Sequence, residues 1–190
     1  MGDDKAITKS LIKTCIYFEL KRKNCYSGYE SLLAEPSCNV GLIQYIKHII
    51  DTRCELESFY QGVNSIITDH ENQTGPANSQ HYQLKKENVV LFAIKIFQVI
   101  VGHDNIRKNQ SQPTQLNTEK ILISLVYMGT FTVICHHLGI AEDLLKPENL
   151  DALTAEIHGY LSVWLREGGA QGWPDKLKRW KDLHLGCVGV

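Results

Sequence analysis

The chain has 190 residues, and its 20 Lys and Arg nearly balance its 21 Asp and Glu. Hydrophobic residues make up 43% of the chain and charged residues 22%, which excludes an intrinsically disordered or collagen-like protein. The formal charge of −1 gives no general attraction for nucleic acid, so we expect no nucleic-acid partner. This length suits one domain that buries its own core.

The cysteines and the N-terminus bear on the cellular compartment. None of the six cysteines forms a CxxC pair, and the first ten residues, MGDDKAITKS, lack the apolar core of a secretory signal. These features predict reduced, structural thiols in a cytosolic or nuclear-facing compartment.

Helical periodicity dominates the first half of the chain, and strand signals are almost absent. We expect a first helix from about Lys5 to Lys23, a second that starts near Asn39, and a shorter third one around residues 59–67. The stretch 69–83 is polar and contains Gly75-Pro76, so it is expected to form a loop.

The second half contains the most apolar segments. A fourth helix is expected from Leu84 to Val101, a second polar loop over 102–116, and a fifth helix over 121–135 that ends by Gly139. The fifth segment is shorter than the ~20 apolar residues of a membrane span. Because it is apolar on all sides, we expect it to be the buried centre of the domain. Four of its side chains are predicted to be buried: Ile121, Leu122, Leu125 and Phe131.

A sixth, amphipathic helix is expected to start at Pro147 and to end at Gly168-Gly169, and a short seventh to follow Trp173-Pro174. The predicted fold is therefore all-α, with a single helical domain over residues 1–190. It is a bundle in which a central hydrophobic helix is wrapped by amphipathic helices.

Catalytic and metal-binding patterns are not evident. His136 and His137 are adjacent, so on a helix they point about 100° apart and do not easily share one ion. The glycines at 168, 169 and 172 follow a helix rather than a strand, which favours a helix end over a nucleotide-binding loop. We therefore expect no enzyme activity, catalytic residue, metal or cofactor. Binding of an amphipathic partner helix in an apolar groove is the class of function that remains.

The end of the sixth helix is the most informative segment. Trp164 is followed by Leu-Arg-Glu, then by Gly168-Gly169 and Trp173. This arrangement resembles the second homology motif of the B-cell lymphoma two (Bcl) family of apoptosis regulators, with a longer spacing between the glycines and the second Trp.

The family's first motif, Asn-Trp-Gly-Arg at the head of the central helix, has two registers in this chain. One aligns it with residues 117–120, so that Asn117 matches the Asn and Lys120 stands in place of the Arg. The other places its Gly on Gly129 and Thr130 in place of the Arg. The first register is favoured because it puts the motif at the start of the helix.

The segment from Leu42 to Asp51 resembles the third, death motif. Ile50 stands where the family has a small residue, and a bulky side chain there would clash in a partner's groove. This favours a pro-survival over a pro-apoptotic role.

The resemblance implies a cytoplasmic protein with a Bcl-type fold, whose hydrophobic surface groove binds the death-motif helix of pro-apoptotic partners. Lys120 would pair with the partner's Asp, and Asn117 would form a hydrogen bond beside it. The groove residues would be Phe59, Val63, Ile96, Ile100, Asn117, Lys120 and Ile121. The motif residues with structural roles would be Leu42, Asp51, Trp164, Gly168, Gly169 and Trp173.

The resemblance also implies a location at the mitochondrial outer membrane. A C-terminal membrane anchor, if the protein has one, would attach it there. Two alternatives stay open. One is a pro-apoptotic, pore-forming member of the same fold, and the other is a helical scaffold with no groove.

Overall fold

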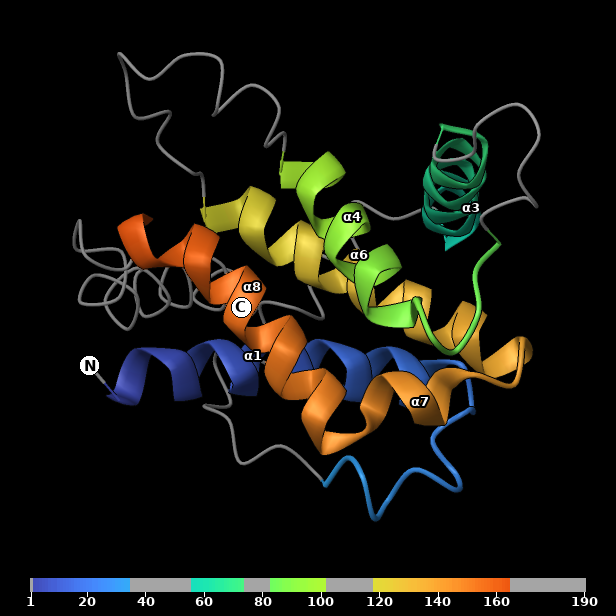
Figure 1. Ribbon diagram of the computed structural model, residues 1–190. Coiled ribbons are helices and arrows are strands. Elements are labelled where there is room, and N and C mark those ends of the chain that lie inside the picture. Colours follow the sequence, from blue (N-terminus) through green and yellow to red (C-terminus); the bar gives the residue numbers. More distant parts are fainter. Residues whose placement is uncertain (1, 35–55, 74–82, 102–117, 165–190) are drawn as a thin grey trace, which may run out of the picture.

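The computed structural model describes residues 2–34, 56–73, 83–101 and 118–164 (Figure 1). Its helices are α1 (Gly2–Arg22), α3 (Leu56–Gln73), α4 (Val89–Val101), α6 (Thr118–His137), α7 (Ala141–Leu145) and α8 (Pro147–Trp164). Every regular element in these ranges is a helix, which confirms the prediction of an all-α protein.

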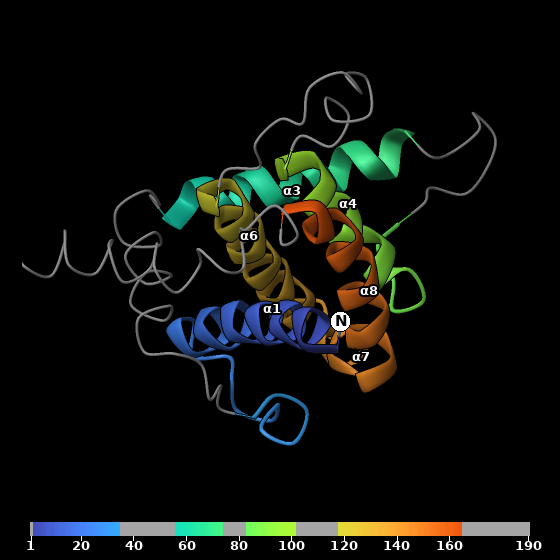
Figure 2. The same ribbon diagram turned by 90° about the vertical axis from the view of Figure 1, so that its left-hand side faces the viewer.

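Four of the helices form a ring. α1 packs on α6, α6 on α4, α4 on α8, and α8 on α1 (Figure 2). Outside this ring, α3 packs on both α4 and α6, and the short α7 packs against α6 and α8. As a result, α6 contacts α1, α3, α4 and α7, so it lies against more elements than an amphipathic surface helix would.

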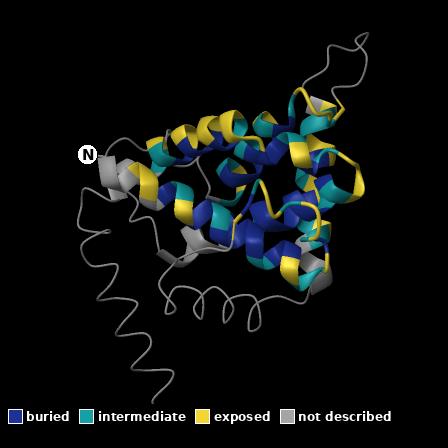
Figure 3. Cartoon of the chain, turned by 90° about the horizontal axis from the view of Figure 1, so that it is seen from below, coloured by how far each residue is buried: buried dark blue, intermediate teal, exposed yellow. Residues whose placement is uncertain are grey.

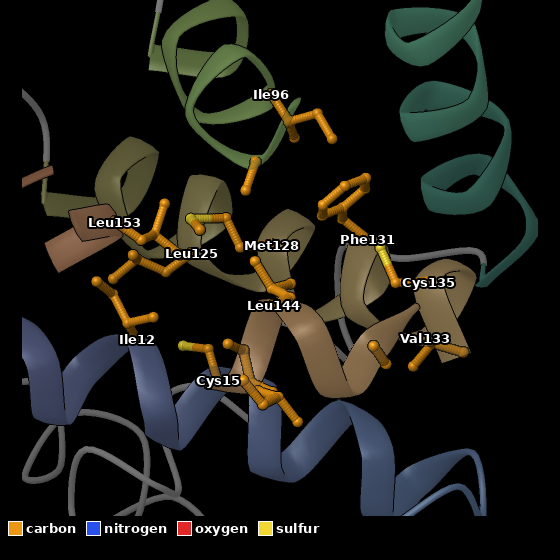
Figure 4. Packing of buried hydrophobic residues seen from close by; sticks show 14 of the residues in the cluster. Ile12, Cys15, Ile96, Leu125, Met128, Phe131, Val133, Cys135, Leu144 and Leu153 are labelled. Atoms are coloured by element: carbon orange, nitrogen blue, oxygen red, sulfur yellow. The ribbon is translucent and has the colours of Figure 1, made fainter. Parts of the chain in front are cut away.

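The core lies inside the ring, where the buried residues of Figure 3 are concentrated. In Figure 4, Leu125 of α6, Ile12 of α1 and Leu153 of α8 point into the same part of this core. Leu125 and Phe131 are fully buried, as predicted. The side chains of Ile121 and Leu122 lie outside the described residues.

The two buried threonines of α6 form hydrogen bonds within the helix itself. Thr130 donates to the carbonyl of Val126, and Thr132 donates to that of Met128 at 2.9 Å. Such bonds to the carbonyl four residues earlier let a Thr lie in an apolar core without an unpaired hydroxyl.

α1 is buried on more sides than an amphipathic helix would be. Its buried residues from position 11 onward are Leu11, Ile12, Thr14, Cys15, Ile16, Tyr17, Glu19 and Leu20. The reason is a close crossing with α6 at Gly129. A Cβ atom on Gly129 would lie 2.6 Å from Cγ of Glu19 and 2.8 Å from the carbonyl oxygen of Cys15.

Two helices end in the same way. The N–H of Cys25 donates to the carbonyl of Leu20 at 2.8 Å, and the N–H of Ile140 donates to that of Cys135 at 2.9 Å. In each case the residue just before the donor has a positive φ angle, which is 56° for Asn24 and 75° for Gly139. These are Schellman ends, which favour Gly or Asn at the left-handed position. The predicted end of the apolar helix at Gly139 is therefore confirmed.

Three differences from the sequence-based prediction concern α3, α4 and α7. α3 continues to Gln73, into the polar stretch expected to be a loop from residue 69. Its last turn is held by Glu71, whose carboxylate accepts a hydrogen bond from the N–H of Leu84 at 2.9 Å. α4 begins at Val89 rather than Leu84 because Asn88 closes a turn before it, accepting from the N–H of Lys85 at 2.7 Å.

The third difference is α7, which the sequence reading did not separate from its neighbours. α8 starts at Pro147, as predicted. The helix expected near Asn39, the loop over 102–116, the expected helix end at Gly168-Gly169 and the helix expected after Trp173-Pro174 lie outside the described residues.

Candidate helix-binding surface

The candidate surface is built on α4, which has two very different faces. Its inner face consists of positions spaced i, i+3, i+4, i+7 and i+8, the pattern of a helix packed against a core. These residues are all buried: Val89, Phe92, Ala93, Ile96 and Phe97. The helix is apolar almost all round, and its one charged residue is Lys95. Its outer face is therefore apolar as well, apart from this lysine.

The outer face contains a row of three residues spaced four apart, Leu91, Lys95 and Val99, which we call the outer row of α4. Leu91 is 55% exposed and Val99 is 45% exposed. In the described part of the chain, one other large hydrophobic residue, Leu138, is comparably exposed. Lys95 lies between the two apolar side chains and forms no ion pair with a described residue.

α3 lies beside α4 and is anchored by few side chains. Of those that the structure describes, Val63 and Ile67 are buried. Gly62 allows a close approach to α6, because a Cβ atom there would lie 3.2 Å from the ring of Tyr127. Among its described residues α3 thus has two buried side chains, and the helix lies outside the central ring.

His70 connects the end of α3 to α4. Its ring meets that of Phe92 edge-on, with 4.8 Å between the ring centroids. Burial lowers the pKa of His70, and the positive charge of Lys95 lowers it further, while the carboxylate of Glu71 acts in the opposite direction. The contact between α3 and α4 therefore favours the neutral imidazole.

Three of the residues predicted to line a groove have described side chains. Val63 of α3 and Ile96 of α4 are fully buried, while Ile100 of α4 is half-buried. α3 and α4 pack on each other and on α6, so the three residues belong to one set of contacting helices. In this conformation a partner helix could reach Val63 and Ile96 only if α3 moved away from α4, so their role in a groove stays a prediction.

The other predicted site residues are placed only in part. Phe59 lies on α3, and Lys120 and Ile121 lie in the first turn of α6, but their side chains are outside the described residues. Trp164 is the last residue of α8, again without a described side chain. The remaining ones lie outside the described ranges: Leu42, Asp51, Asn117, Gly168, Gly169 and Trp173.

Of the two registers proposed for the first motif, the one on Gly129 and Thr130 falls on described residues. Gly129 faces α1, and Thr130 is only 1% exposed and is bonded to its own helix. Neither residue is presented to a partner. The register on residues 117–120, with Lys120 in place of the Arg, stays a prediction, because Asn117 and the side chain of Lys120 lie outside the described residues.

A polar cluster at the end of α1 was missed by the sequence reading. Glu19 is fully buried, and its carboxylate accepts hydrogen bonds from Nε of Arg22 at 3.0 Å and from Nη2 at 2.9 Å. Burial, together with the charge of Glu19, raises the pKa of Tyr60 to about 12. Nζ of Lys23 lies 4.7 Å from the centroid of the Tyr60 ring. The spacing of Glu19 and Arg22 is visible in the sequence, but their burial is not.

His136, near the end of α6, has a structural role. Nδ1 of His136 lies 2.7 Å from the hydroxyl of Tyr29, which fixes the loop after α1 to the end of α6. Among the described residues, no three His, Cys, Asp or Glu side chains are grouped so that they could hold a metal ion. A search of the same residues for a helix long and apolar enough to cross a bilayer finds none.

Comparisons with protein families, with curated proteins and with solved structures find no match to this chain.

Proposed function

We propose that this protein is a pro-survival regulator of Bcl type that binds the death-motif helix of pro-apoptotic partners on an apolar surface bounded by α3, α4 and α6. It would act in the cytoplasm and at the mitochondrial outer membrane. The observation that carries the proposal is that α4, which packs on both α3 and α6, is apolar almost all round. An amphipathic helix recognises such a surface through anchors spaced i, i+3 or i+4, and i+7.

The polar part of the recognition would come from the first turn of α6. Lys120 would pair with an acidic residue of the partner, and Asn117 would form a hydrogen bond beside it. A lysine is a point charge and lacks the bidentate fork of arginine, so this pair tolerates more than one geometry.

Access to the deeper apolar positions would require α3 to move. Val63 of α3 and Ile96 of α4 are fully buried, and among the described side chains of α3 only Val63 and Ile67 are buried. An element with few buried apolar contacts opens at a lower free-energy cost than the rest of a domain. Binding would thus replace contacts of α3 with contacts of the partner helix.

One observation favours a second candidate function. The full burial of Val63 and Ile96 is also what a helical scaffold with no groove would have. Direct binding measurements separate the two functions, because a scaffold of this kind has no affinity for death-motif peptides.

The test is titration of labelled death-motif peptides with the full chain by fluorescence polarisation. We expect the wild-type protein to bind, and Lys120→Glu to weaken binding at least about tenfold, or about 1.4 kcal/mol. The variant should keep its fold, because a Glu in the first turn of α6 is favourable to the helix dipole. Lys5→Glu, an exposed position on α1, is the control. Failure of the wild-type protein to bind any death-motif peptide would overturn the proposal.

A further inference from the structure

The outer row of α4 combines features that an ordinary solvent-facing row does not have. Leu91 and Val99 account for two of the three exposed large hydrophobic residues in the described part of the chain. They flank Lys95 at equal spacing, four residues on either side. α4 has no acidic residue, and Lys95 forms no ion pair within the described ranges.

This pattern defines the chemistry of a complementary surface. An apolar residue, a cation and a second apolar residue along one helix match an apolar residue, an acid and a second apolar residue along another. A second copy of the same row does not fit, because a symmetric contact would place two Lys95 side chains against each other. The charge thus indicates an acidic partner helix rather than self-association through this row.

We propose that the partner helix docks along the outer row of α4, with an acidic side chain opposite Lys95 and aliphatic side chains against Leu91 and Val99. Because the partner is taken to be the same amphipathic helix, this assignment rests on the proposed function. It adds a second cation to the recognition, separate from Lys120, and makes affinity depend on a second acidic residue of the partner.

The position of the row supports a partner that bridges α3 and α4. Phe92, next to Leu91 in the chain, contacts His70 of α3, and the charge of Lys95 acts on the same His70. The row thus runs close to the line where α3 meets α4. A helix docked there would cover Leu91 and Val99 as well as the positions that a movement of α3 exposes.

The test uses the full chain and two peptides, a death-motif peptide and a designed amphipathic helix with one Glu between Leu residues four positions away. We expect Lys95→Glu to weaken binding of both at least about tenfold. A peptide whose acid is replaced by Lys should bind Lys95→Glu better than it binds the wild-type chain, since the charge pair is then restored in reverse. Leu91→Ser should weaken binding, and Leu138→Ser, which removes an equally exposed side chain outside the row, should not.

The outcomes separate this inference from the proposed function. If the wild-type chain binds death-motif peptides and the variants at 91 and 95 bind them equally well, the outer row is not the contact surface, and the proposed function stands. If the chain binds only the designed acidic helix and does so through Lys95, the outer row is confirmed and the proposed function is wrong. Circular dichroism of each variant shows whether the fold is retained, and Lys95→Gln replaces any charge-reversal variant that unfolds.

Discussion

Replacing Gly129 by Ala tests the close crossing of α1 and α6. The new Cβ atom would lie 2.6 Å from Cγ of Glu19 and 2.8 Å from the carbonyl oxygen of Cys15, and both distances are far below van der Waals contact. Because one of the two atoms belongs to the backbone of α1, a side-chain rotation cannot relieve the overlap. α1 and α6 would have to move apart.

The magnitude follows from two opposing effects. Overpacking of a core costs about 1–3 kcal/mol, and a contact with backbone belongs at the upper end of this range. Ala is a better helix former than Gly by about 1 kcal/mol, which offsets part of the cost. We therefore expect a net loss of about 2 kcal/mol in the free energy of unfolding, and a fall in the melting temperature of about 4–8 °C.

Urea unfolding followed by circular dichroism measures this difference, and Gly159→Ala is the matched control. Gly159 lies in the middle of α8, and a Cβ atom there would meet nothing within 4 Å. The same substitution should therefore stabilise the protein at position 159, by about 1 kcal/mol. If Gly129→Ala were as stable as Gly159→Ala, the reasoning about the α1–α6 crossing would be wrong.

Three further predictions concern polar contacts. The pKa of His70 is lowered from 6.5 in the folded protein, so the unfolded chain binds a proton first and stability is lost as the pH falls below about 6.5. His70→Gln should reduce this acid-dependent loss, as measured by urea unfolding at pH 5.5 and pH 7.5. Glu19→Ala leaves Arg22 without its buried partner and should destabilise the protein by about 3 kcal/mol, whereas an effect below 1 kcal/mol would mean that Glu19 is solvated. Tyr29→Phe removes the 2.7 Å contact with His136 and should cost about 1 kcal/mol in thermal unfolding, a loss that His136→Ala should not increase much further.

The parts of the fold that could be predicted are those fixed by local signals. The apolar run of α6 indicated a core helix, Gly139 marked its end through a left-handed backbone conformation, and Pro147 marked the start of α8. Each of these depends on residues within one or two helical turns. Local sequence therefore contains the required information.

The other features depend on segments far apart in the chain. α3 extends into a polar stretch because Glu71 is held by the backbone of Leu84, thirteen residues later. The burial of Glu19 depends on α6, which begins about a hundred residues further on. For Val63 and Ile96, hydrophobicity alone could not separate a core position from a groove position, since both require an apolar side chain.

The position of α1 has a consequence for synthesis of the protein. α1 is made before α6 and α8, the helices that bury it. Until residues 118–164 have left the ribosome, the apolar side chains of α1 have no native partner, and they are exposed to solvent or to other chains. We therefore expect nascent chains that end before α6 to be retained by chaperones or to aggregate. Chains synthesised without α1 would conversely expose the apolar faces of α6 and α8.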